Sequence, residues 1–145
     1  MKKFLLTVFA VCCAVVMCHA ADAPSGWTTD IDAAFKTAAR ENKKVLVLFT
    51  GSDWCGWCKR LYKDVLNKGK FKKYAKEKLV LVYFDFPNKK KISPEQMKIQ
   101  EQWRKKFGVS GYPTTVILSP KGKKLGTISG YCQLDDYIGK IQKAK

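Results

Sequence analysis

Two cysteines three residues apart, Cys55 and Cys58, follow closely after an apolar run that spans residues 45–49. A continuous apolar run of this length is typical of a strand buried on both faces of a sheet. On the first turn of a following helix, residues i and i+3 share one face, so the two sulfur atoms can reach the ~2 Å of a disulfide. The spacing therefore predicts a buried strand that leads into a cysteine pair at the start of a helix.

The start of a helix also favours the chemistry of a thiolate. Its partial positive charge stabilises an anion and lowers the pKa of a cysteine there. We expect this effect at Cys55, with Lys59 one turn further on. Zinc binding and a purely structural disulfide are alternatives, but zinc usually needs four ligands. A disulfide that closes so short a loop removes little chain entropy, so thiol–disulfide exchange is the favoured interpretation.

The first twenty residues have the pattern of a signal peptide. Two lysines precede an apolar run over residues 4–17, and Ala20 is a small residue at a plausible cleavage point. The run is shorter than the roughly 20 apolar residues of a membrane-spanning helix. We expect residues 1–20 to be removed and residues 21–145 to form one exported domain, periplasmic or secreted. An uncleaved anchor is the alternative.

Removal of this segment would leave three of the six cysteines and would take away the single histidine, His19. One chain would then lack four ligands for a structural zinc ion, so we expect no metal, and thiol–disulfide exchange needs no organic cofactor. Cys132 stays outside the pair. An odd cysteine in an exported protein is either a small buried thiol or a reactive thiol near the pair, and both interpretations stay open.

The chain is strongly basic, with 28 Lys+Arg, 12 Asp+Glu and a net charge of +16. Its lysine doublets are spread along the chain, as is typical of solvated faces. A basic protein binds anionic surfaces and meets acidic partners quickly. Nucleic acid fits poorly with export, and no recognition motif is present. We expect a monomer with no nucleic-acid partner and with peripheral contact to anionic surfaces.

The apolar patterns predict eight elements in the order α-β-α-β-α-β-β-α. Capping boxes are expected at Thr29 and Ser93, and Ile99, Trp103 and Phe107 should line the third helix before a glycine ends it. The expected helices begin near residues 31, 55, 94 and 134, and the expected strands span residues 45–49, 79–86, 114–118 and 124–129. A glycine, Gly69, should break the second helix. A strand–helix–strand unit followed by a hairpin implies a mixed sheet with helices on both faces.

Two motifs make the chain resemble the thioredoxin-like superfamily over residues 29–143. The first is Trp54-Cys55-Gly56-Trp57-Cys58-Lys59 after a strand, and the second is Gly111-Tyr112-Pro113-Thr114 before another strand. The chain is most similar in kind to exported, single-domain members with a Trp-Cys-Gly-Trp-Cys-Lys motif. The resemblance implies a thioredoxin-like α/β fold with a central mixed sheet.

The resemblance also implies roles for individual residues. Cys55 would be the exposed nucleophile and Cys58 the buried resolving thiol of a redox-active disulfide. Pro113 would be a cis-proline whose loop binds substrate backbone. The substrate-binding residues would be Trp54, Trp57, Tyr112 and Pro113. Packing in the core or at the rim is the alternative for the Trp54 and Tyr112 rings.

Three features depart from thioredoxins proper, which have a proline where Trp57 stands and a buried acid near the position of Leu48. That acid helps to move a proton from the resolving thiol, so the proton route here is an open question. The unpaired Cys132 is the third departure. The implied function is a thiol:disulfide oxidoreductase, a reductase of exported protein disulfides that works with a redox partner. A disulfide oxidant or isomerase, and a non-enzymatic basic binding module with an inert disulfide, are alternatives.

Overall fold

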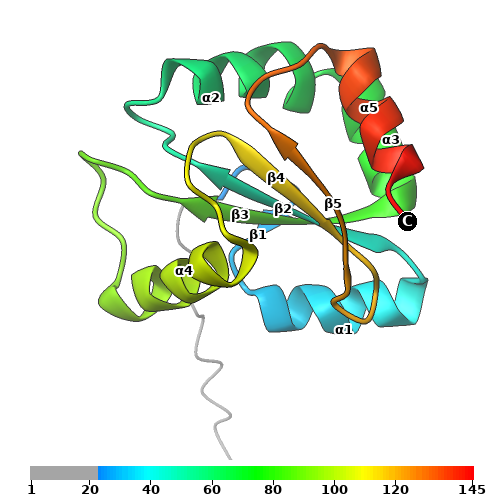
Figure 1. Ribbon diagram of the computed structural model, residues 1–145, viewed down its shortest axis with the longest axis horizontal. Coiled ribbons are helices and arrows are strands. Elements are labelled where there is room, and N and C mark those ends of the chain that lie inside the picture. The colour runs from blue at the N-terminus through cyan, green and yellow to red at the C-terminus, as the bar shows by residue number, and fades with distance from the viewer. Residues whose placement is uncertain (1–22) are drawn as a thin grey trace, which may run out of the picture.

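The computed structural model describes residues 23–145, so the predicted signal peptide lies outside the described residues. Five strands form one sheet in the order β1-β3-β2-β4-β5 (Figure 1). The strands are β1 (Trp27–Thr28), β2 (Lys44–Thr50), β3 (Leu79–Asp85), β4 (Thr114–Leu118) and β5 (Lys124–Ser129). Pairing is parallel between β2 and β3 and antiparallel between β2 and β4. The expected mixed sheet is therefore confirmed.

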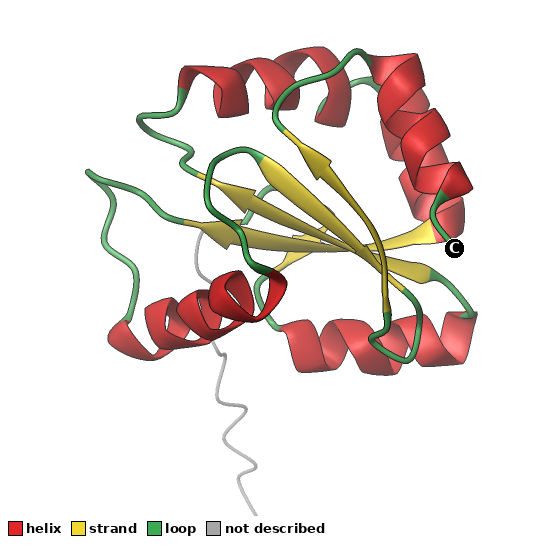
Figure 2. Ribbon diagram, in the orientation of Figure 1, coloured by secondary structure: helices red, strands yellow, loops and turns green. Residues whose placement is uncertain are grey.

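Helices cover both faces of this sheet (Figure 2). They are α1 (Ile31–Glu41), α2 (Gly56–Leu61), a π-helical turn η1 (Tyr62–Leu66), α3 (Gly69–Lys78), α4 (Pro94–Phe107) and α5 (Leu134–Lys143). Helices α1 and α4 lie on one face, and α2, α3 and α5 lie on the other (Figure 1). The thioredoxin-like arrangement of helices around a central sheet is thus present.

Strand β2 lies at the centre of the sheet and is buried on both faces, as its sequence predicts. Leu46 and Leu48 pack into the apolar cluster beneath α2, η1, α3 and α5. Val45, Val47 and Phe49 pack into the opposite cluster, which is covered by α1 and α4. Because β2 and β3 are parallel and β4 is antiparallel, the ends of β2 and β3 and the start of β4 lie together at one end of the strands of the sheet.

The amino-terminal part of the domain differs in detail from the prediction. Strand β1 was not predicted, because two residues at the edge of the sheet are too few to show a periodic pattern. Helix α1 is capped by Asp30 rather than Thr29, since the Asp30 carboxylate accepts the Ala33 amide at 2.9 Å. The second helix passes through η1 and ends before Gly69, which begins α3.

Helix α4 begins as predicted, with the Ser93 hydroxyl accepting the Gln96 amide at 3.1 Å. The prediction that Ile99 lines the apolar face is wrong, because Ile99 is 39% exposed and the adjacent Gln100 is 1% exposed. The Gln100 amide group donates to the Asp85 carbonyl at 2.7 Å and accepts the Asp85 amide at 3.3 Å. Strand β1 stops before reaching Asp85, so Gln100 supplies the hydrogen bonds that a neighbouring strand would have made.

Candidate active site

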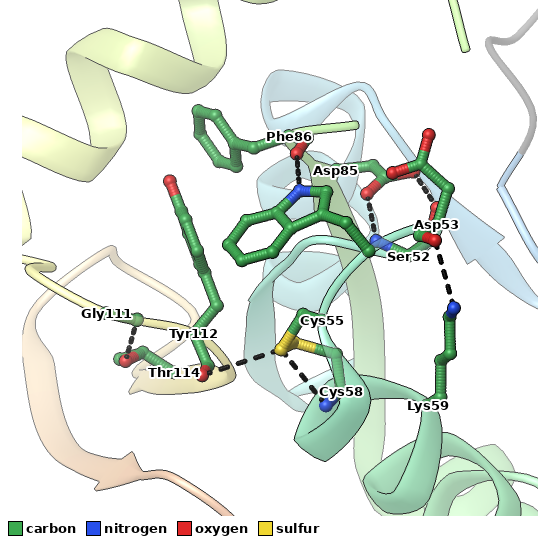
Figure 3. The surroundings of a disulfide bond; sticks show 11 residues. Ser52, Asp53, Cys55, Cys58, Lys59, Asp85, Phe86, Gly111, Tyr112 and Thr114 are labelled. Carbon is green, nitrogen blue, oxygen red and sulfur yellow. Dashed lines mark hydrogen bonds between the residues drawn. A yellow bond between two sulfur atoms is a disulfide. The ribbon is translucent and has the colours of Figure 1, made fainter. Parts of the chain in front are cut away.

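The cysteine pair lies just beyond the end of the central strand β2, where the chain passes into α2 (Figure 3). Cys55 and Cys58 form a disulfide, with their Cα atoms 5.2 Å apart. Cys55 is the N-cap of α2, and the Cys58 amide donates to its sulfur at 3.2 Å. An N–H donor aimed at a sulfur atom stabilises negative charge there. In the reduced protein this contact favours the thiolate of Cys55.

The exposure of the two cysteines differs less than expected. Cys55 was predicted to be exposed, but it is 6% exposed in the disulfide form, against 4% for Cys58. The physical reason is the loop that faces the pair, since the Tyr112 carbonyl oxygen lies 3.7 Å from the Cys55 sulfur. Cys58 lines a cavity behind the disulfide. The two sulfur atoms are therefore distinguished by their surroundings rather than by their exposure.

The loop before β4 carries the proline predicted to face the pair. The Tyr112–Pro113 peptide bond is cis, which confirms the predicted geometry. The Thr114 hydroxyl donates to the Gly111 carbonyl at 2.8 Å, and the Gly130 amide donates to the Pro113 carbonyl at 2.8 Å. These bonds hold the loop beside the disulfide. Substrate binding by Pro113 stays a prediction.

Trp54 and Tyr112 form one aromatic patch beside the disulfide. Their ring centroids are 5.9 Å apart in an edge-to-face arrangement, and Tyr112 stacks on Phe86 at 5.2 Å. The Trp54 indole N–H donates to the Phe86 carbonyl at 2.7 Å, although the side chain is 45% exposed. Burial raises the pKa of Tyr112. The rings therefore pack on one another and also present a surface to solvent.

A second aromatic patch lies around Trp57, which is 56% exposed. The Arg60 guanidinium lies 5.4 Å from the centre of the Trp57 ring and 4.9 Å from that of Tyr131. The Trp57 and Tyr131 rings are themselves 5.8 Å apart. The sequence motif indicated Trp57 but not Arg60. Arg60 lies between Trp57 and Tyr131, and Tyr131 comes from the distant turn between β5 and α5.

Asp53 holds the loop that follows β3 against the site. Its carboxylate accepts the amides of Asn88, Lys89 and Lys90 at 2.9, 2.6 and 3.1 Å. These amides, that of Asn88 foremost, hold the pKa of Asp53 below its ordinary value. The Lys59 ammonium donates to the Asp53 carbonyl at 2.9 Å. Lys59 therefore lies beside the Asp53 turn, where Figure 3 shows it.

Behind the disulfide lies a cavity of about 400 Å³. Its walls include Leu48, the apolar residue of β2 that stands near the position of the buried acid in thioredoxins proper. An acid that sequence reasoning missed, Asp85, lies nearby at the end of β3 and is buried. Its carboxylate accepts the amide of Ser52 at 2.8 Å and also the Ser52 hydroxyl. The sequence signal for Asp85 was its position at the end of an apolar strand parallel to β2.

Cys132 lies in the turn between β5 and α5 and is half-buried. Its neighbour Tyr131 packs on Trp57, so this turn is on the same side of the molecule as the disulfide. Burial raises the pKa of the Cys132 thiol, and Lys140 partly offsets the rise. A buried, inert thiol and a thiol that takes part in exchange both stay open as interpretations of Cys132.

Residues 23–145 contain no group of three or more His, Cys, Asp or Glu side chains placed to hold a metal ion. None of the helices in this range is long and apolar enough to cross a membrane.

The chain is similar to several known proteins. A family described as a thioredoxin-like domain matches residues 31–145. The disulfide bond reductase DsbH of Chlamydia pneumoniae is 33% identical over 92 residues, which are 63% of this chain and 55% of DsbH. The thioredoxin-related protein DsbJ of the same organism is 28% identical over 108 residues, which are 72% of this chain and 30% of DsbJ.

Solved structures are also similar to this chain. A structure described as DsbH oxidoreductase has a TM-score of 0.76 and 26% identity, covering 99% of this chain and 94% of that one. The reduced carboxy-terminal domain of DsbD from Neisseria meningitidis has a TM-score of 0.62 and 23% identity, covering 79% and 94%. The chain thus spans about half of one curated relative and less than a third of the other.

Proposed function

We propose that this chain, which belongs to the thioredoxin-like domain family, is a thiol:disulfide oxidoreductase that reduces disulfides of exported proteins. One observation carries the proposal. Cys55 and Cys58 form a disulfide at the start of α2, with the Cys58 amide aimed at the Cys55 sulfur and the Tyr112–Pro113 loop facing it. This arrangement favours attack by Cys55 and resolution by Cys58.

In the proposed reaction the Cys55 thiolate attacks one sulfur of a substrate disulfide. The bond between the substrate sulfurs breaks, a mixed disulfide forms, and the first substrate thiolate leaves and takes up a proton. Cys58 then loses its proton and attacks the Cys55 sulfur, which releases the second substrate thiolate. The substrate gains two electrons and the cysteine pair loses two. A redox partner must return them for the next cycle.

The surroundings of the disulfide support a protein as the substrate. The exposed Trp54 and Trp57 rings lie next to the pair in the sequence, and Tyr112 contacts both the Trp54 ring and the Cys55 sulfur. Partly exposed aromatic rings supply contact area at low entropic cost. Substrate backbone would lie along the Tyr112–Pro113 loop, with the two aromatic patches contacting side chains on either side.

The direction of electron flow and the compartment are parts of the same proposal. A relative named as a disulfide bond reductase is 33% identical over 92 residues, which favours reduction over oxidation or isomerisation. The signal-peptide pattern over residues 1–20 favours export of residues 21–145 to the periplasm or the exterior. Protein disulfides persist in such compartments unless they are reduced.

Insulin reduction driven by dithiothreitol tests the activity. The wild-type protein should accelerate precipitation of insulin chains, and Cys55→Ser should reduce the rate to that of dithiothreitol alone. Equal rates for the two proteins would instead favour a binding module with an inert disulfide. Equilibration of the pair with glutathione tests the direction, since a reductase should have a potential near the thioredoxin value of about −270 mV. A potential near the ~−120 mV of a strong oxidant would contradict the reductase assignment.

A further inference from the structure

The cavity behind the disulfide connects Cys58 with the surface. Cys58 and Leu48 form buried parts of its wall, and the exposed Lys59 and Lys90 form parts of its rim. The volume of about 400 Å³ is ample for water. Hydroxyl groups of Ser52, Thr50, Tyr62 and Tyr83 also belong to residues that line it. The cavity therefore gives water and protons a route between the resolving cysteine and the surface.

Resolution of the mixed disulfide requires such a path, because only a thiolate attacks a disulfide. Cys58 is buried, and burial favours the neutral thiol. The strand residue beside it is Leu48, which has no proton acceptor. The cavity walls include no carboxylate residue among residues 23–145. The proton of Cys58 must therefore leave through water in the cavity, alone or with the help of side chains that line it.

Ser52 and Asp85 form an oriented pair of hydrogen bonds next to this cavity. The Ser52 hydroxyl donates to one carboxylate oxygen of Asp85, and the Ser52 amide donates to the other at 2.8 Å. Since the hydroxyl proton of Ser52 is directed at Asp85, its oxygen is free to accept a proton from another group. Gln100 fixes the backbone of Asp85 from the opposite side. The carboxylate is therefore held in place, and Ser52, which lines the cavity, links Asp85 to it.

Tyr83 brings a second hydroxyl to the same place. It is paired with Leu48 in the register of β2 and β3, so its ring lies beside the position where the acid is missing. The ring packs edge-to-face on Trp27 with centroids 5.8 Å apart. Burial is the largest cause of a raised pKa of Tyr83, the charge of Asp85 adds to it, and the nearby Ser52 side chain partly offsets it. Tyr83 and Ser52 line the same cavity, and the raised pKa keeps the Tyr83 hydroxyl neutral.

We propose that Tyr83, Ser52 and Asp85 form a proton path that accepts the thiol proton of Cys58 during resolution. The inference rests on the proposed function. Water in the cavity takes the Cys58 proton and passes one to the Tyr83 oxygen. Tyr83 passes its hydroxyl proton to Ser52, and Ser52 passes its own to the Asp85 carboxylate. The thiol loses one proton, Asp85 gains one, and both hydroxyl groups remain neutral. The three side chains are positioning residues, because they act on Cys58 through water.

The other ionisable groups around the cavity do not fit this role. Lys59 donates to the Asp53 carbonyl, and an ammonium group has no lone pair to accept a proton. Lys90 is exposed at the rim, and its amide is bound by the Asp53 carboxylate. Tyr62 lines the cavity from η1, whereas Tyr83 is paired with Leu48 in the sheet. Tyr62→Phe is therefore a matched control for Tyr83→Phe.

The reaction of the reduced protein with dithionitrobenzoate, an aromatic disulfide, separates the two chemical steps. Attack by Cys55 releases one equivalent of coloured thiol, and attack by Cys58 on the mixed disulfide releases a second. Stopped-flow absorbance gives the two rates over a range of pH. Every variant carries Cys132→Ser, so that the third thiol contributes no signal. Urea unfolding confirms that each variant is folded.

Tyr83→Phe should slow the second release by about 10- to 100-fold and leave the first unchanged. Its second rate should also rise about tenfold per pH unit, because hydroxide must then remove the proton, whereas the wild-type rate should vary little near neutral pH. Ser52→Ala should reproduce both effects, and Tyr62→Phe should show neither. A wild-type second rate and pH profile in Tyr83→Phe, or equal slowing by Tyr62→Phe, would overturn the proton path. Failure of the proposed function would appear differently, as the loss of the two-step release in the wild-type background.

Discussion

Gly51 tests how tightly the turn before the cysteine pair packs against Trp54. A Cβ atom at Gly51 would lie 2.5, 2.6 and 2.7 Å from three atoms of the Trp54 indole. Ordinary contacts between carbon atoms are about 3.5–4.0 Å. The Gly51→Ala variant must therefore displace the indole, which is partly exposed and can move toward solvent.

The free-energy change follows from the contacts that this movement breaks. The indole N–H would lose its bond to the Phe86 carbonyl, worth about 1 kcal/mol. The edge-to-face contact with Tyr112 would be lost as well, worth about 0.5–1.5 kcal/mol. Alanine also restricts the unfolded chain, which offsets about 0.4–1 kcal/mol. We expect Gly51→Ala to lower the free energy of unfolding of the oxidised protein by roughly 1–2 kcal/mol.

A double-mutant cycle in urea, followed by far-UV circular dichroism, isolates the clash. In a Trp54→Ala background the added methyl group meets no indole, so Gly51→Ala should be neutral or slightly stabilising. The coupling energy between the two positions should therefore be roughly 2 kcal/mol. A coupling below about 0.5 kcal/mol would refute the reasoning, because the cost of alanine would then arise elsewhere.

Three further outcomes are expected. On non-reducing gels Cys58→Ser should accumulate mixed disulfides with substrate proteins and Cys55→Ser should trap none; the reverse pattern would contradict the assigned order of attack. Tyr137→Phe should lower the free energy of unfolding by about 1–2 kcal/mol, because it removes the buried partner 2.6 Å from the Thr115 hydroxyl; adding Thr115→Val should restore much of the loss, and no restoration would contradict this cause. Because burial raises the pKa of Cys132, its labelling by iodoacetamide in the oxidised, folded protein should reach half of its maximal rate only above pH ~8.5. At neutral pH this labelling should be at least about tenfold slower than labelling in urea. Equal rates would show that the thiol is free at the surface.

Local patterns predicted most of the architecture. The apolar run of β2, the Ser93 cap of α4 and the two arms of the hairpin depend on neighbouring residues, and each lies where its pattern indicated. The cysteine pair is equally local, because four residues contain both sulfur atoms. The resemblance to thioredoxin-like proteins added the cis peptide at Pro113, which composition and periodicity do not contain.

The remainder depends on partners that are distant in the chain. Ser52 and Asp85 are 33 residues apart, and only the register of β2 against β3 brings them together. Gln100 reads as a solvent-facing residue of α4 until the backbone of Asp85 is placed beside it. The low exposure of Cys55 also depends on a distant segment, since it is covered by the loop that precedes β4. Pattern reasoning identifies elements and motifs, but not the side chains that adjacent strands bring together.

The ends of β2 and β3 and the start of β4 lie together, which places the side chains around the disulfide on loops and leaves the strands to support the fold. The loops after β2 and β3 and before β4 carry Trp54, Phe86 and Tyr112, while the strands beneath them are held by their own apolar clusters. Trp54 is the most exposed of the three rings, so a substitution there should cost the fold less than one in the strands, and under the proposed function it should alter which protein disulfides are accepted. Under the proposed function, substrate range can therefore change through a few loop side chains while the interior strands stay the same.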